Sequence, residues 1–294
     1  MDMLAATLDH QHFTYGWLNP VVGLAFAAAG SFLGLSASRH ARAATGAAGR
    51  FRWILMAALA IGGIGIWMMH FTAMIGFTVT EADIAYDPAL TAASLGLAVL
   101  AVGLGLFVSG GGRAGWPRLV LGGLVCGAGV VGMHYTGMAA IATGGRLVYE
   151  PPLVAASAVV AVVASTVALR FTAVAMRRGS MTLASAVMSV AVVGMHYTGM
   201  AAVTVEGPAS EPVTGISPLV LLLPILILAL ISIVGMVFGV LASPSFDATE
   251  SAAAPGVPLA PFGSSSFDAG AGGGPSERND RPSATVRLAD AAGQ

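Results

Sequence analysis

Seven long apolar stretches decide the fold class of this chain. They cover approximately residues 17–38, 51–77, 89–109, 118–141, 153–176, 181–204 and 217–241. A helix that crosses the hydrocarbon core of a bilayer needs about 20 apolar residues, and each stretch reaches that length. The stretches are continuously apolar, whereas the strands of a membrane barrel alternate over about 10 residues. The sequence therefore predicts an all-α membrane protein, a bundle of seven transmembrane helices in a lipid bilayer.

The arginines predict how this bundle is oriented. They gather at the first, third and fifth connections between the stretches, namely Arg39, Arg42, Arg50, Arg52, Arg113, Arg118, Arg170, Arg177 and Arg178. The other side carries only Arg146, together with every acidic residue that precedes residue 242. Because cytoplasmic loops are enriched in Lys and Arg, we expect a multi-pass protein of the cell membrane with its N-terminus outside and its C-terminus in the cytoplasm.

Composition divides the chain into three parts. We expect residues 1–16 to form an outer N-terminal segment, residues 17–241 the membrane domain, and residues 242–294 a disordered cytoplasmic tail rich in Ala, Gly, Pro and Ser. The tail is too short and too polar for an output enzyme. We therefore expect no enzymatic activity and no nucleic-acid binding, and any signal has to leave through the helices to an unidentified signalling partner protein.

One six-residue phrase recurs in the second, fourth and sixth apolar stretches. It reads Met-His-Phe-Thr-Ala-Met at 69–74 and Met-His-Tyr-Thr-Gly-Met at 133–138 and 195–200. The spacing between the histidines is 64 and then 62 residues, and each interval holds two predicted spans. The repeats are therefore parallel, as three two-helix units followed by a seventh helix. All three motifs are predicted at the same depth near the outer face, which favours one shared site.

Helical geometry sorts the motif residues by direction. Residues four positions apart stand on one face of a helix, which pairs His70 with Met74, His134 with Met138, and His196 with Met200. The preceding Met69, Met133 and Met195 lie about 100° further round. The aromatic residues that follow each histidine project the other way and are predicted to act behind the ligands; they are Phe71, Tyr135 and Tyr197. Gly137, Gly199 and Ala73 are small enough to let helices approach closely.

Histidine and methionine together favour copper as the bound species. Imidazole is a borderline ligand and a thioether is a soft one, a combination that suits Cu(I) far better than Mg²⁺ or Ca²⁺. The predicted ligands are Met69, His70, Met74, Met133, His134, Met138, Met195, His196 and Met200. His10 and His12, just outside the first helix, are possible additional ligands, whereas His40 is expected to be a solvated loop residue and Cys126 a packing residue.

A structural explanation of the motif is also available. A single methionine in a membrane helix usually only packs, and a single histidine can form a hydrogen bond to a neighbouring helix. Seven of the 14 methionines, however, lie within a few positions of the three histidines. An ionisable residue at membrane depth is a functional hypothesis by default, and the coincidence favours a ligand site.

The motifs resemble those of the MHYT domain, an integral membrane sensor domain of bacteria. The resemblance covers approximately residues 12–241, and two of the three motifs read Met-His-Tyr-Thr in full, whereas Phe71 removes one tyrosine hydroxyl. It implies copper binding near the outer face through Met69, His70, Met133, His134, Met195 and His196, and sensing of oxygen, carbon monoxide or nitric oxide. Many relatives are fused to GGDEF and EAL domains, and this chain has neither.

These observations predict a membrane sensor that binds copper and responds to a diatomic gas or to redox state. A copper storage or handling protein would use the same ligands and is one alternative. A haem electron carrier is another, because two histidines on facing helices would hold a haem. The absorption spectrum of the purified protein would separate these alternatives.

Overall fold

The chain is almost entirely helical in the computed structural model, which describes residues 7–80, 82–110, 115–174, 178–207 and 213–241. Its helices are α1 (Leu18–Ala43), α2 (Ala47–Ala58), the π-helix η1 (Leu59–Met68), α3 (Met69–Met74), α4 (Pro88–Val108), α5 (Trp116–Ala139), α6 (Pro151–Ala173), α7 (Arg178–Met200) and α8 (Pro218–Leu241). Six helical segments of the described residues are long and apolar enough to cross a membrane. The prediction of an all-α membrane protein is therefore confirmed.

The predicted spans agree closely with the observed helices. The six membrane-crossing segments correspond to the first six predicted stretches, and the seventh stretch, 217–241, is the 24-residue helix α8. Whether α8 also crosses the bilayer stays a prediction. The second span is composite, because α2, η1 and α3 follow one another without a break from Ala47 to Met74. Its middle ten residues are π-helical. π-Helices are rare in proteins, and those that do occur are often found at functional sites.

Local sequence explains where several helices begin. The Asp87 side chain accepts a hydrogen bond from the backbone N–H of Leu90 at 2.8 Å and caps α4, with Pro88 as the first helical residue. Proline also occupies the first turn of α5 and α6, where its missing N–H costs nothing. These residues fix the helix starts on both sides of the bundle.

Six helical segments form a closed ring. Going round it, α1 packs against the α2–η1–α3 segment, which packs against α4, followed by α5, α6 and α7, and α7 returns to α1. The segments that carry the three motifs, α3, α5 and α7, thus alternate with α4, α6 and α1. Helix α8 lies outside the ring and contacts η1, α1 and β4. Because the ring closes through α1, the three motifs face a common centre.

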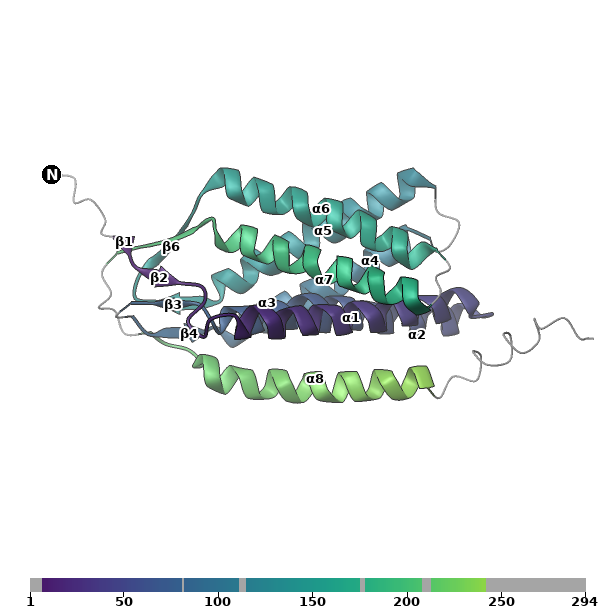
Figure 1. Cartoon of the computed structure of the whole chain (residues 1–294), viewed down its shortest axis with the longest axis horizontal. Helices are drawn as coiled ribbons and strands as arrows, with labels where there is room; N and C mark the ends of the chain where they lie inside the picture. Colours follow the sequence, from purple (N-terminus) through teal and green to yellow (C-terminus); the bar gives the residue numbers. More distant parts are fainter. Residues whose placement is uncertain (1–6, 81, 111–114, 175–177, 208–212, 242–294) are drawn as a thin grey trace, which may run out of the picture. The chain divides into compact units, whose positions relative to one another are not determined.

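Short strands follow each motif and gather at one end of the helices (Figure 1). They are β1 (Thr7–Leu8), β2 (His10–Gln11), β3 (Thr78–Val79), β4 (Ile84–Tyr86), β5 (Ile141–Thr143), β6 (Arg146–Tyr149) and β7 (Val203–Glu206). All pairs are antiparallel: β7 pairs with β1 and β6, β2 with β3, and β4 with β5. The sequence analysis did not predict these strands.

The opposite end of the bundle carries the arginines. Arg42, on α1, donates a hydrogen bond to the carbonyl of Thr172 on α6, and Arg50 donates one to the carbonyl of Gly110 at 3.0 Å. Apart from Arg146 on β6, the described arginines and the strands therefore lie at opposite ends of the helices, as the alternation of charge predicts. Which end faces the cytoplasm stays a prediction.

One prediction about this end was wrong. His40 is not a solvated loop residue, because α1 continues to Ala43 and buries His40 in its last turn. Its ring stacks on Trp53 with centroids 4.3 Å apart, and Nδ1 lies 2.9 Å from the carbonyl oxygen of Ser36. The predicted tail, residues 242–294, lies outside the described residues, as do residues 1–6 of the predicted outer segment.

Candidate metal centre

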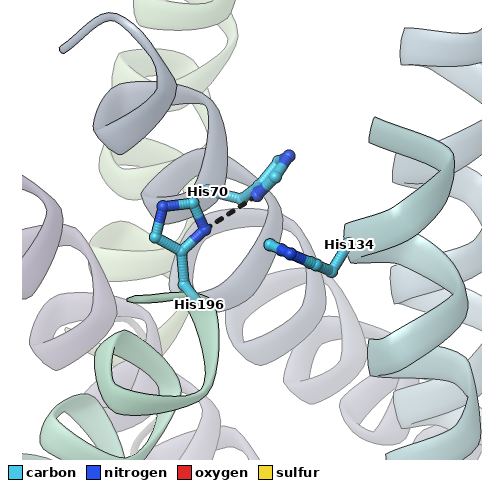
Figure 2. Close-up of side chains that lie close together, drawn as sticks. All are labelled: His70, His134 and His196. Carbon is cyan, nitrogen blue, oxygen red and sulfur yellow. Dashed lines mark hydrogen bonds between the residues drawn. The ribbon is translucent and has the colours of Figure 1, made fainter. Parts of the chain in front are cut away.

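Three helices deliver one histidine each to the centre of the ring. His70 lies on α3, His134 on α5 and His196 on α7, and each is within four or five residues of the end of its helix. The motifs thus sit somewhat nearer the helix ends than the sequence predicted, because a turn and a strand follow immediately. Their side chains converge from three sides (Figure 2).

The three imidazole rings form a compact cluster. Their ring centroids are 5.0, 5.0 and 5.3 Å apart, and each pair meets edge to face. Nδ1 of His70 lies 3.0 Å from Nδ1 of His196, and one ring nitrogen from each histidine lies within 4.8 Å of the others. All three are enclosed, with exposed fractions of 0, 1 and 2% for His70, His134 and His196. Three buried histidines could therefore hold a metal ion here.

Several polar atoms of this cluster are unsatisfied. Nε2 of His70 and both ring nitrogens of His134 are buried without a hydrogen-bond partner. Leaving a buried polar group unpaired costs about 1–3 kcal/mol, and unpaired groups in a folded protein call for an explanation. A bound ion would take one lone pair from each neutral imidazole, and at His134 it would give one of the two nitrogens a partner.

Two glycines of the motif make room for the rings. A Cβ atom added to Gly137 would lie 2.5 Å from Nε2 of His70, and one added to Gly199 would lie 2.5 Å from Nε2 of His134. Each ring therefore rests against the backbone of the next motif-bearing helix. The corresponding residue of the first motif is Ala73. The sequence analysis attributed these small residues to helix approach, but at both glycines it is an imidazole that uses the space.

The aromatic residue after each histidine connects the cluster with the strand-bearing end. Phe71, Tyr135 and Tyr197 each pack edge to face against the histidine that precedes them. Phe71 then contacts Tyr86 of β4, Tyr135 contacts Tyr149 of β6, and Tyr197 stacks on Phe13. The hydroxyl of Tyr135 also forms a 3.0 Å hydrogen bond with that of Ser157 on α6. A supporting role for these aromatics stays a prediction.

The six motif methionines are all buried, but their surroundings differ. Met69 packs in a small cluster with Ala27 and Ala73, and its Sδ lies 4.0 Å from where a Cβ of Gly23 would stand. The other five, Met74, Met133, Met138, Met195 and Met200, belong to the main core. A ligand role for their sulfur atoms stays a prediction.

His10 and His12 lie near the cluster without belonging to it. The only group of three or more potential ligands among the described residues is His70, His134 and His196. His10 and His12 instead face each other, with centroids 5.2 Å apart, in the N-terminal segment. Burial, and to a lesser extent His10, lowers the pKa of His12.

An apolar cavity lies in the ring on the side of the cluster away from the strands. It offers about 50 Å³ to the centres of water-sized spheres, and one water needs about 10–15 Å³ by this measure. Met195, the neighbour of His196, is part of its wall, with residues that precede the other two motifs on their helices, such as Ile66 and Val130. Cys126 also lines it and, as predicted, is buried without a disulfide.

The sequence analysis missed the strands, although signals for two of them exist. Arg146–Tyr149 ends with Val148 and Tyr149, which favour strands, and Val203–Glu206 alternates apolar and polar residues. Alternation of this kind is typical of half-buried strands. It was overlooked because each run is only four residues long and lies directly beside a much stronger helical signal.

Comparison with known families matches the repeat. The model of the MHYT family, described as "Bacterial signalling protein N terminal repeat", matches residues 63–122, 127–186 and 190–253. Each matched repeat starts before a motif and runs through the following helix, so α1 stands outside the repeats in sequence. In space α1 occupies the ring position beside α7. The matched repeats therefore start one helix later than the predicted two-helix units, and the second helix of the third repeat, α8, lies outside the ring.

Curated relatives match in the same region. The chain is 42% identical over 156 residues to the bifunctional diguanylate cyclase/cyclic di-GMP phosphodiesterase MucR of Pseudomonas aeruginosa, a match covering 51% of this chain and 22% of MucR. It is 32% identical over 208 residues to the signaling protein YkoW of Bacillus subtilis, covering 68% and 26%, and 36% identical over 168 residues to the cyclic di-GMP phosphodiesterase NbdA of Pseudomonas aeruginosa, covering 54% and 21%.

The matches span about a quarter or less of these relatives' own length. No solved structure matches the chain. The family match, by contrast, extends over more than half of the chain and includes all three motifs. With three such repeats around one histidine cluster, this chain belongs to the MHYT family of bacterial signalling proteins.

Proposed function

We propose that this protein is a membrane sensor whose three histidines bind one copper ion and which responds to a diatomic gas or to redox state. The observation that carries the proposal is the convergence of His70, His134 and His196, buried and with unpaired nitrogens, at the centre of the ring. A cluster that served packing alone would not need three ionisable groups at membrane depth.

The spacing of the nitrogens suits a metal ion. Imidazole nitrogens lie about 2.0–2.1 Å from a bound zinc ion, and copper is similar in size, so two nitrogens on one ion stand about 3–4 Å apart. The 3.0 Å separation of the His70 and His196 nitrogens falls in this range. The ligand nitrogens of the other two histidine pairs lie within 4.8 Å of each other. Rotation of a ring would bring them into the range for one ion.

The chemistry of the surroundings favours copper among the first-row metals. The cluster holds no carboxylate, and each six-residue motif begins and ends with a methionine, whose side chain is a thioether. Divalent copper binds nitrogen ligands most tightly of its row, and soft thioethers favour Cu(I). Met74, Met138 and Met200, one turn after the histidines, and Met69, Met133 and Met195, directly before them, are the proposed sulfur ligands.

Copper, when bound there, would supply reversible gas binding and a change of oxidation state. The chain's own part is to hold the imidazoles, to keep water out and to report a change in their position. Gly137 and Gly199 fix two of the rings from behind. Three aromatic residues contact both the histidines and the strand-bearing end, namely Phe71, Tyr135 and Tyr197. A shift of a histidine ring would therefore change the packing of the strand-bearing end.

The cavity beside the cluster supports the proposal that the protein binds a small apolar ligand. Its room of about 50 Å³ is enough for a few molecules of water size, and apolar cavities of proteins stay dry and take up apolar molecules such as xenon. Oxygen, carbon monoxide and nitric oxide are of the right size and polarity. The three imidazole rings contact one another, with centroids 5.0, 5.0 and 5.3 Å apart, so no porphyrin plane lies between any two of them, which argues against the haem alternative.

A signalling role is supported by the relatives. The matched region of MucR, YkoW and NbdA is a part of proteins named for signalling or for cyclic di-GMP turnover. We infer that this chain supplies the sensing part, at the outer face of the cell membrane, and that the signal passes to a partner protein in the cytoplasm. Copper storage or handling is the alternative, and it would use the same histidines.

Metal analysis tests the proposal. The wild-type chain should be purified without an added histidine tag and loaded with copper, and should then retain about one copper per chain. The variant H70A/H134A/H196A should retain almost none while remaining folded by circular dichroism. Full copper retention by the folded triple variant would overturn the proposal, and a b-type haem spectrum of the wild type would restore the electron-carrier hypothesis.

A further inference from the structure

The N-terminal segment crosses the ends of the helices that carry the cluster. Strand β2 pairs with β3, which follows α3, so that His10 stands opposite Val79. Thr14 donates hydrogen bonds to the Gly76 carbonyl from its backbone N–H, at 3.2 Å, and from its hydroxyl, at 3.0 Å. Phe13 stacks on Tyr197 of α7, with centroids 5.3 Å apart. The segment is thus fastened to two of the three motif-bearing helices.

Two histidines of this segment form a pair. His10 and His12 are two residues apart, so their side chains leave the same side of the extended chain. Their rings meet edge to face at 5.2 Å, and both pack against Phe77, at 6.0 and 5.5 Å. Both are half-buried, in contrast to the fully buried cluster. A solute that cannot reach the cluster directly can therefore reach this pair from the water.

The ring nitrogens of the pair are prepared for binding. Nδ1 of His10 lies 3.4 Å from the carbonyl oxygen of Leu8, to which it can donate, and this leaves Nε2 with its lone pair. Metal-bound histidines commonly donate their other N–H in this way. Nδ1 of His12 is buried and has no hydrogen-bond partner. The pair thus offers Nε2 of His10 and Nδ1 of His12, and the second of these lacks a hydrogen-bond partner among the described residues.

The half-buried pair is connected to the covered cluster through its neighbour in the chain. Phe13, which follows His12, stacks on Tyr197, which follows His196. The cluster itself is covered, with exposed fractions of 2% or less. Stripping an ion of its water before it reaches buried ligands is costly, so an intermediate set of ligands on the way lowers that cost.

We propose that His10 and His12 form a loading site, which takes a copper ion from the outer aqueous phase and passes it to His70, His134 and His196. The ion exchanges water for the two imidazoles of the pair and then exchanges these for the imidazoles of the cluster. Its oxidation state does not change, and the water returns to the solvent. This inference rests on the copper-binding function proposed above and adds a second site to it.

Loading kinetics test the inference on the full chain in lipid nanodiscs. Metal-free wild type and the variant H10A/H12A are mixed with a weakly chelated copper salt, and bound copper is followed with time. The variant should load at least about 10-fold more slowly, in line with the 10–100-fold effects of groups around metal sites, and should reach the same final occupancy. Q11A, which changes the residue between the two histidines, should load at the wild-type rate.

The control outcomes separate the two proposals. An unchanged loading rate in H10A/H12A, with copper bound in the end, would overturn the loading site and leave the sensor proposal intact. H10A alone, which leaves the buried His12 ring in place, should show part of the delay and serves as the comparison if the double variant unfolds.

A second measurement tests copper binding by His10 and His12 independently of the cluster. H70A/H134A/H196A retains His10 and His12, which are expected to bind copper too weakly to keep it through purification. Its electron paramagnetic resonance spectrum, recorded with Cu²⁺ in excess, should therefore show nitrogen-bound copper. Adding H10A/H12A to this variant should remove that signal. A triple variant whose spectrum shows no such copper would refute the loading site, whatever the wild type binds.

Discussion

Two regions of this protein bury histidine in opposite ways. At the arginine-bearing end, His40 stacks on Trp53 and places Nδ1 2.9 Å from a backbone carbonyl. At the strand-bearing end, the three cluster histidines face one another, and His134 has no hydrogen-bond partner at either nitrogen. A buried imidazole that is bonded to the backbone serves the fold. Imidazoles that are buried together without such partners are arranged for something that binds between them.

The largest difference is expected in copper binding. H70A, H134A or H196A each removes one nitrogen that water replaces poorly in an enclosed site, and each should lower copper affinity by at least about 100-fold. H40A removes an equally buried imidazole from the other region and should leave affinity unchanged. Competitive titration with a copper chelator measures both. Equal losses in H40A and the cluster variants would show that the effect is general destabilisation.

The second-largest effect on copper binding is expected at the glycines that contact the imidazole rings. In G137A the new methyl group would lie 2.5 Å from Nε2 of His70, so the ring has to move. We expect copper affinity to fall by about 10–100-fold, as is typical when the groups around metal ligands are changed. G194A, on α7, meets nothing within 4 Å and is the matched control. If G137A binds copper as tightly as G194A does, the glycine does not position the ring.

The stability of the metal-free protein should change in opposite directions in the two regions. H134L replaces a ring with two unpaired nitrogens by an apolar side chain, which should stabilise the metal-free protein by about 1 kcal/mol. H40L loses a hydrogen bond and a stacking contact and should destabilise by a similar amount. Thermal unfolding of both variants in detergent gives the sign. A lower melting temperature for H134L would mean that the cluster is structural.

The smallest effect is expected at the cavity. A161L fills part of its wall from α6 and should slow the association of carbon monoxide with the copper-loaded protein several-fold, on the order of 1 kcal/mol in the barrier, without changing copper content. A156L places the same side chain on the exposed face of α6 and serves as control. Flash photolysis measures the rate. The same rate in both variants would remove the cavity from the proposal.

The helices and the convergence of the histidines could be predicted for one physical reason. Both follow from short-range patterns in the sequence. Apolar runs of 20 residues and a motif at nearly equal spacing need no knowledge of distant contacts. The strands are different, because β1 is formed only when Thr7 and Leu8 meet Glu206 and Val205 across the whole chain. The π-helical turn before His70 and the buried position of His40 likewise depend on packing against neighbouring helices, which periodicity does not encode.

X-ray absorption at the copper edge tests the central claim most directly. The copper-loaded wild type should show about three nitrogen scatterers at about 2.0 Å with the multiple-scattering pattern of imidazole, with or without a sulfur from the neighbouring methionines. H134A should lose one of these nitrogens. A wild-type spectrum without imidazole, or one that H134A leaves unchanged, would contradict a copper centre built from His70, His134 and His196.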